Sequence, residues 1–289
     1  HNNLGNIFEE LNHLNKAKNC YKNVLAINPD SAEGYFNIGK VFQKQKQFKS
    51  AIKIYEKTLS INPNYANTHL NLGNIFQDMG QLDKAVDNYQ KAIKIKKDDY
   101  EAYYELGMAF NQLGKLDMSI ESYEKALYIN PKFGDAHNSL GNIFNQAGQI
   151  EKALKSYEKA LSINPEHAEV YFNLGNLMLD LNKLDKAVAN YEHAIKLKPG
   201  IDCNFGNLLH TKMHLCSWDN FSNNLEELLK KIKNGKKSIS PFSLAALIDD
   251  AKIQLKNAKI FSQEITSRNN VLSKINGHLN HKKIRIGYF

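Results

Sequence analysis

The chain has 289 residues, of which 42% are hydrophobic and 24% charged, and its formal net charge is +8. This length allows a substantial buried core, and no apolar run reaches the roughly 18–20 residues needed to span a bilayer, so we expect a soluble protein with no membrane partner. Residues 1–200 hold 24 Lys or Arg against 23 Asp or Glu, whereas residues 201–289 hold 14 against 7. Because the excess lies in the tail, and Arg268 and Arg285 are the only arginines, we expect no nucleic-acid binding.

The cysteines and the chain start bear on compartment and processing. Cys20, Cys203 and Cys216 are odd in number and widely spaced, which favours a reducing compartment over a disulfide framework. We therefore expect a cytoplasmic protein. The chain starts at His1 with no initiator Met, and we expect further repeats to precede it.

The first 200 residues repeat with a period of 34. The register is marked by a glycine series and a tyrosine series, and by an alanine series that is interrupted at Ser119. A fixed period of this length indicates stacked copies of one supersecondary unit. The glycines are Gly5, Gly39, Gly73, Gly107, Gly141 and Gly175, and the tyrosines are Tyr21, Tyr55, Tyr89, Tyr123, Tyr157 and Tyr191.

Residues 66–99 show what one unit contains. Apolar residues recur at helical spacing over 66–77, and a second apolar face runs over 82–95. Gly80 lies between them and is suited to the left-handed position that ends a helix. In most other units an Asn-Pro step ends the second helix. One such pair cannot bury both faces alone, so neighbouring pairs must stack into a right-handed solenoid.

This pattern resembles the tetratricopeptide repeat. The resemblance covers residues 1–200 as one partial and five full units. It implies an all-α fold class, a right-handed α-solenoid of helix pairs, and a protein-binding groove on the concave side. In this family the residue two positions before the glycine lies on the first helix and faces that groove.

Asparagine occupies this groove position in most units, and Glu105 and Ser139 interrupt the series. A carboxamide offers both a donor and an acceptor, so it can hold the backbone of an extended polypeptide whatever its side chains. The chain contains 36 asparagines, so a solvated helix surface remains the alternative interpretation. We name the predicted peptide-binding residues the asparagine ladder: Asn3, Asn37, Asn71, Asn173 and Asn207.

The tail predicts a degenerate repeat and a helical linker over 201–283, then a single strand over 284–289. Residues 201–215 continue the register as a seventh first helix, although Leu209 replaces its glycine. The strand would be the first of a truncated α/β domain. The other expected elements are an amphipathic helix over 219–233 that stops at Asn234-Gly235, a polar loop with Ser240-Pro241, and a helix capped by Asp249-Asp250 that carries Ile253, Leu255, Ala258 and Phe261.

The order of these features resembles the linker of the O-linked N-acetylglucosamine transferase and SPINDLY family, glycosyltransferase family 41. The resemblance rests on residues 210–218, Ser240-Pro241-Phe242 and residues 284–288. Family members typically show Cys-Asp-Trp where this chain has Cys216-Ser217-Trp218. The resemblance implies a parent enzyme that uses a UDP-sugar donor on a protein acceptor. Its catalytic histidine and nucleotide-sugar pocket would follow the strand, so we expect no catalytic or cofactor-binding residue in this chain.

Alternative interpretations remain for the whole chain and for its histidines. The chain could be a stand-alone adaptor that holds proteins together without catalysis. His210, His214 and Cys216 have a spacing compatible with metal binding, but no fourth ligand accompanies them, so we expect helix packing and no metal site. His69 and His137 take the place of tyrosines in sister units, which also predicts packing roles. Neither oligomeric state nor acceptor is indicated.

Overall fold

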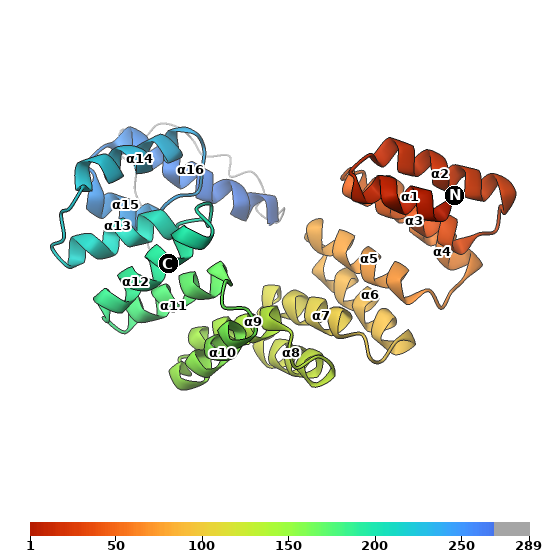
Figure 1. The fold of residues 1–289 in the computed structure, drawn as a ribbon, viewed down its shortest axis with the longest axis horizontal. Coiled ribbons are helices and arrows are strands. Elements are labelled where there is room, and N and C mark those ends of the chain that lie inside the picture. The colour runs from red at the N-terminus through yellow and green to blue at the C-terminus, as the bar shows by residue number, and fades with distance from the viewer. Residues whose placement is uncertain (269–289) are drawn as a thin grey trace, which may run out of the picture.

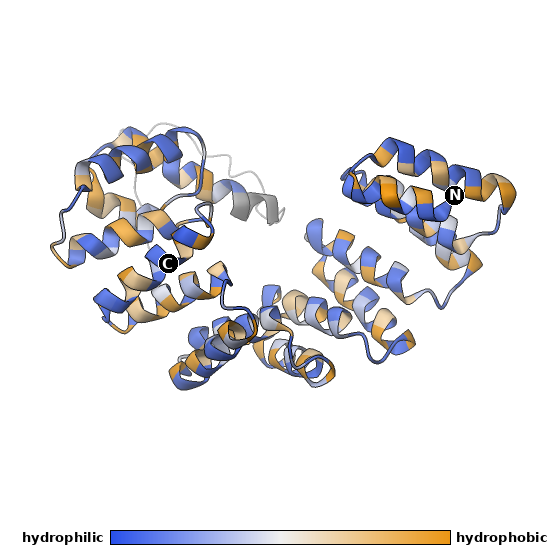
Figure 2. Ribbon diagram, in the orientation of Figure 1, coloured by the Kyte–Doolittle hydropathy of each residue, from blue (hydrophilic) through white to orange (hydrophobic). Residues whose placement is uncertain are grey.

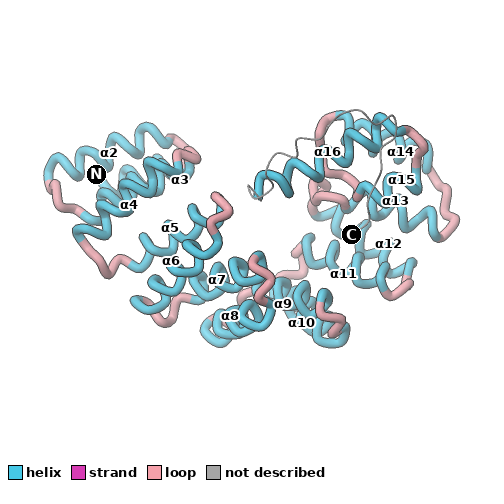
Figure 3. The backbone as a smooth tube through the Cα atoms, turned by 180° about the vertical axis from the view of Figure 1, so that it is seen from behind, coloured by secondary structure: helices cyan, strands magenta, loops and turns pink. Residues whose placement is uncertain are grey.

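The computed structural model describes residues 1–268, and regular structure in that part of the chain is entirely helical (Figure 3). No helix among the described residues is long and apolar enough to cross a membrane. The strand expected at 284–289 lies outside the described residues. The helices are α1 (Asn2–Glu10), α2 (Leu14–Ile27), α3 (Ala32–Lys44), α4 (Phe48–Ile61), α5 (Ala66–Asp78), α6 (Leu82–Ile95), α7 (Tyr100–Gln112), α8 (Leu116–Ile129), α9 (Gly134–Gln146), α10 (Ile150–Ile163), α11 (Ala168–Asp180), α12 (Leu184–Leu197), α13 (Asn204–His214), α14 (Phe221–Lys233), α15 (Pro241–Leu247) and α16 (Ala251–Arg268).

Helices α1–α12 form six pairs that stack side by side into a curved arch (Figure 1). The first helices α5, α7, α9 and α11 lie on the inner side of the arch, and their partners α6, α8, α10 and α12 lie on the outer side. Successive first helices contact one another directly, as α3 does with α5 and α9 does with α11. Hydrophobic and hydrophilic residues alternate along each helix (Figure 2). The predicted all-α solenoid is confirmed.

A glycine-tyrosine contact joins the two helices of each unit. A Cβ atom added to Gly73 would lie 2.4 Å from Cε1 of Tyr89, and one added to Gly141 would lie 2.5 Å from Cε1 of Tyr157. Atoms that close clash, so the tyrosine ring can occupy this place only because the glycine has no side chain. All six tyrosines are at most 1% exposed. The two 34-residue series are therefore the two sides of one contact.

Four of the six tyrosine hydroxyls are satisfied by a second row of asparagines, each directly after a unit's glycine. Tyr89 donates to Oδ1 of Asn74 at 2.8 Å, and Tyr157 donates to Oδ1 of Asn142 at 2.7 Å. A buried hydroxyl without a partner would cost free energy, which explains asparagine at this position. Two further pairs are Tyr21 with Asn6 and Tyr191 with Asn176.

Local signals end the helices as the sequence predicts. Gly80 has a φ of 70° between α5 and α6, and the equivalent residue of every unit is also left-handed. At the Asn-Pro steps the asparagine side chain accepts from a backbone N–H two residues later, as Asn62 does from Asn64. Asp99 caps α7 and Asp250 caps α16. The left-handed residues at the turns are Asn12, Lys46, Gly80, Gly114, Gly148 and Asn182.

Helices α13–α16 cover one end of the arch with a core of their own. Leu209, which replaces the glycine of the register, is buried in that core with Leu228, Ile232, Ile239 and Leu244. The close approach moves to Gly206, where a Cβ would lie 2.4 Å from the carbonyl oxygen of Ser238. In α13 a loop, and not a tyrosine ring, makes the close approach to a glycine.

Three expectations for the tail need correction. Helix α13 begins at Asn204 because Cys203 is left-handed, with a φ of 63°. The segment at Ser240-Pro241 is the start of α15 and not a loop, since proline suits the first turn of a helix and the Ser240 side chain caps it. The helix expected over 219–233 is α14 and begins at Phe221, after Asn220 in the left-handed conformation.

The glycine-tyrosine contact can be tested in α9. Gly141→Ala should lower stability by about 1–3 kcal/mol, because the new methyl group overlaps the Tyr157 ring. Gly134→Ala in the same helix is the control, since the nearest atoms to its Cβ lie 3.8 Å away. Urea denaturation followed by circular dichroism measures both. Equal midpoints for the two variants would contradict the close-packing account.

Candidate peptide-binding face

The ladder positions lie on the first helices, at the contacts between successive units. Asn71 donates through Nδ2 to the Tyr55 hydroxyl of the preceding unit at 3.2 Å. Asn173 donates to Oδ1 of Asn138 at 3.0 Å. Three of the five ladder side chains therefore bond to the preceding unit. The third such bond runs from Asn207 to Oδ1 of Asn176, at 3.0 Å.

The two ladder residues nearest the start of the chain differ from the others. Asn37 is 5% exposed and lines a hollow of about 330 Å³ between α1 and α3, together with Glu9 and Lys40. Asn3 is exposed and lines a different hollow, between α1 and the end of α2. Asn37 therefore lies on the first helix α3 but is almost wholly buried, and Asn3 is not in contact with it.

A buried acid at this end of the face is neutralised by lysines of the next unit. The Glu9 side chain is bonded to Lys44 at 2.8 Å and to Lys40 at 3.2 Å, and it accepts from the Tyr21 hydroxyl at 3.1 Å. Burial alone would raise the pKa of the Glu9 carboxyl, but the hydrogen bonds and charges of Lys44 and Lys40 outweigh burial and lower it. The sequence gives no local signal of this cluster, because Lys40 and Lys44 lie 31 and 35 residues after Glu9.

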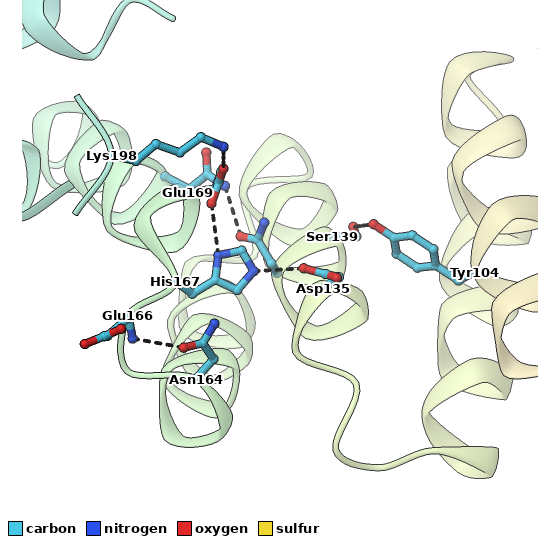
Figure 4. Close-up of polar contacts among 10 residues, drawn as sticks. Tyr104, Asp135, Ser139, Asn164, Glu166, His167, Glu169 and Lys198 are labelled. Carbon is cyan, nitrogen blue, oxygen red and sulfur yellow. Dashed lines mark hydrogen bonds and ion pairs between the residues drawn. The ribbon is translucent and has the colours of Figure 1, made fainter. Parts of the chain in front are cut away.

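A second polar bridge crosses between α9 and α11 (Figure 4). His167 contacts Oδ1 of Asp135 through Nε2 at 2.9 Å and Oε2 of Glu169 through Nδ1 at 3.3 Å. Lys198 also bonds to Glu169, and its hydrogen bond is the main reason that the pKa of the Glu169 carboxyl is lowered. Lys198 thus compensates the charge of Glu169, and His167 links Glu169 to Asp135 of the preceding unit.

Glu105, which interrupts the ladder at mid-array, has no such partner. It is half-buried, and it makes no hydrogen bond or ion pair within the described part of the chain. Burial, reinforced by the charges of Glu101 and Asp78, raises the pKa of its carboxyl to about 7. In the sequence, Glu105 is visible only as a position where the asparagine ladder is interrupted. The titratable groups around it are Asp78 of α5, Tyr89 of α6, Glu101 and Tyr104 of α7, and Tyr123 of α8.

The remaining candidate residues make packing contacts. His137 is 9% exposed and its Nε2 contacts the carbonyl oxygen of Pro131 at 3.3 Å. His210 and His214 lie edge to face with 3.4 Å between their Nε2 atoms. Across residues 1–268 no group of three or more His, Cys, Asp or Glu is arranged to hold a metal ion.

Stacked helix pairs with a polar inner face define a helical-repeat solenoid protein. The family models that match are described as "TPR repeat" and "Tetratricopeptide repeat". Together they cover residues 5–201 without a gap, which is more than half of the chain. The chain belongs to the tetratricopeptide-repeat family. The first model matches residues 5–46, 73–114 and 141–182, and the others match 32–65, 100–133, 168–201, 54–87 and 122–155.

Several solved structures have the same fold. MamA is 29% identical with a TM-score of 0.51, over 56% of this chain and 95% of MamA. YrrB, described as a TPR protein with an unusual peptide-binding site, is 20% identical with a TM-score of 0.53, over 67% of this chain and 97% of YrrB. PilF of Pseudomonas aeruginosa is 20% identical with a TM-score of 0.62, over 68% of this chain and 90% of its own. Comparison with curated proteins gives no match.

The environment of Glu105 predicts a pH-dependent loss of stability. The unfolded chain ionises this group near 4.5, whereas the folded chain holds the proton up to about pH 7, so folding loses stability as the pH rises across this interval. Glutamine does not titrate. The stability of Glu105→Gln relative to the unchanged protein should therefore rise by roughly 2 kcal/mol between pH 4.5 and 7 and stay level above that.

Urea denaturation at several pH values measures this difference. Glu121→Gln in α8 is the control, because Glu121 is exposed on the outer helix of the same unit. A Glu105→Gln curve parallel to that of the control at every pH would contradict the assigned environment.

Proposed function

We propose that this chain binds an extended polypeptide along the inner face of helices α3–α13, with the ladder carboxamides holding the backbone of the ligand. The observation that carries the proposal is the position of Asn71, Asn173 and Asn207, each anchored to the preceding unit by one hydrogen bond. The carbonyl oxygen of each carboxamide accepts no hydrogen bond among the described residues, and the second N–H of Asn71 and of Asn173 is also left for a ligand. Such anchoring lowers the entropy cost of ordering the side chain on binding.

The spacing of the first helices suits an extended chain. Packed helices lie about 8–10 Å apart, and an extended polypeptide advances roughly 3.3 Å per residue. Each unit can therefore meet the ligand about once in three residues. Backbone recognition at these points would not itself select the side chains of the ligand.

We further propose that the arm serves a protein O-glycosyltransferase, to which it would deliver acceptor chains. The support is the resemblance of residues 210–218, Ser240-Pro241-Phe242 and residues 284–288 to the linker of that family. A UDP-sugar would be the donor, and a catalytic domain following residues 284–289 would bind it. A stand-alone adaptor is the competing function, because the inner face alone fits either role.

Asn173→Ala should weaken the binding of extended peptides about tenfold, because the variant loses a carboxamide that meets the ligand backbone. The probes are fluorescein-labelled peptides selected from a random library on the unchanged protein, and fluorescence anisotropy measures their affinity. Asn190→Ala in α12 is the matched control. Asn190 also makes one side-chain hydrogen bond, to the carbonyl oxygen of Lys186 at 2.8 Å, but on an outer helix.

Each variant loses one side-chain hydrogen bond, so both melting temperatures should fall by a similar amount. The proposal predicts that only Asn173→Ala loses affinity. Equal affinity of the two variants for every selected peptide would refute the role of the ladder, and failure to select any peptide would refute peptide binding itself.

The glycosyltransferase and adaptor functions differ in the full-length gene product. We expect its reading frame to continue beyond Phe289 into alternating strands and helices, and its purified product to transfer radiolabelled sugar from UDP-N-acetylglucosamine to serine or threonine of a bound protein. A frame that stops near Phe289 would instead establish the adaptor.

A further inference from the structure

Charge is distributed unequally between the two rows of helices. The outer helices α6, α8, α10 and α12 carry nine lysines and nine acids, so they are balanced. The first helices of the same four units carry no Lys or Arg at all. Their six acids are Asp78, Glu101, Glu105, Asp135, Glu169 and Asp180. Glu169 is bonded to Lys198 and Asp135 contacts His167, but the other four acids have no such partner among the described residues. The central part of the inner face is therefore acidic, although the chain as a whole is basic.

The few lysines on the other first helices do not offset these acids. Lys40 and Lys44 of α3 are both bonded to Glu9. Lys212 of α13 is bonded to Glu192 of α12 at 2.6 Å. Among the described residues, each lysine of a first helix thus already forms an ion pair with an acid of another helix.

Acids of three neighbouring units lie near one another. Burial raises the pKa of Glu105 in α7, and the charges of Glu101 and of Asp78 in α5 add to this effect. Burial also raises the pKa of the Tyr104 hydroxyl, and the charges of Asp135 in α9 and of Glu105 add to it. These acids therefore extend from α5 over α7 to α9.

Glu9 and Glu105 are both at least partly shielded from solvent, but only Glu9 has cationic partners among the described residues. A buried carboxylate costs free energy unless a cation accompanies it. The chain supplies two lysines to Glu9 and none to Glu105 within the described residues. A ligand ammonium or guanidinium group at Glu105 would supply the missing cation and would restore the pKa of its carboxyl towards the ordinary range.

Aromatic rings cluster around Tyr104, which precedes Glu105 in α7, and they offer a surface for the aliphatic part of such a side chain. The Tyr104 ring packs 4.9 Å from the Phe133 ring and 5.5 Å from the Tyr123 ring, centre to centre. The Tyr100 ring also packs against Phe133, at 5.1 Å. Lysine and arginine side chains pack their apolar stems on rings while the charged end reaches a carboxylate.

We infer that the inner face selects basic polypeptide segments, and that Glu105 determines this specificity by binding a lysine or arginine side chain of the partner protein. This inference rests on the proposed function, since it concerns the same face. It identifies the partner chemistry as an extended segment with a basic residue at about every third position, which matches the spacing of the first helices. The face and the segment complement each other in charge.

The inference can be tested with three fluorescein-labelled peptides of repeated Ser-Ala-Lys, Ser-Ala-Gln or Ser-Ala-Glu units. The full chain should bind the lysine peptide at least about tenfold more tightly than the glutamine peptide, and the glutamate peptide most weakly. Added salt should weaken the binding of the lysine peptide. Anisotropy titrations near pH 8 measure the three affinities, since Glu105 is then ionised.

Glu105→Gln should bind the lysine peptide about tenfold more weakly than the unchanged protein, and it should bind the glutamine peptide equally well. Glu121→Gln, on the outer face of the same unit, should leave both affinities unchanged. Loss of folding cannot produce this result, because Glu105→Gln removes a destabilising charge at this pH. Circular dichroism confirms that the variant is folded.

The possible outcomes separate this inference from the proposed function. Equal affinity for the lysine and glutamine peptides, or equal effects of Glu105→Gln and Glu121→Gln, would overturn the inference but leave peptide binding intact. If none of the peptides binds, including those selected from the library, the proposed function fails and the inference fails with it. Tighter lysine-peptide binding after Lys282, Lys283 and Arg285 are changed to glutamine would identify the chain's own basic end as the occupant, and would also overturn the inference.

Discussion

The contact of a tyrosine ring with a glycine backbone determines the geometry of the whole array. It brings the two helices of a unit together at a distance that no Cβ atom permits, as between Gly73 and Tyr89. The tyrosine hydroxyl then reaches the first helix, where Asn74, the residue after Gly73, accepts its hydrogen bond. The contact therefore links the buried core to the inner face. A change in either partner alters the packing of the unit and the surface available to a ligand together.

Most of the solenoid could be predicted from the sequence, because its helices begin and end on local signals. Gly80 and the Asn-Pro steps each act within a few residues, and the structure confirms them. The start of α15 was missed because a Ser-Pro pair is compatible with both a loop and a helix start. Contacts between units have no comparable signal. The Glu9 bridge to Lys40 and Lys44 depends on how two helices are placed in space.

The candidate site was predictable to a similar extent. The register alone places Asn37, Asn71, Asn173 and Asn207 on the first helices, and the structure agrees. It could not indicate that three of them also bond to the preceding unit, since those bonds require the packed array. Nor could it distinguish Glu105 from an ordinary substitution. The unusual property of Glu105 comes from burial beside Glu101 and Asp78, and both depend on neighbouring helices.

The turn between the helices of each unit has a consequence for the order in which the array opens. Its left-handed residue is glycine in the three central units but Asn12, Lys46 and Asn182 in the others. A side chain in this conformation costs on the order of 1 kcal/mol, most of all at Lys46, because lysine cannot offset it through local hydrogen bonds as asparagine can. Repeat arrays melt unit by unit. The units with strained turns should therefore unravel at lower temperatures, so that the centre of the arch keeps its shape longest on heating.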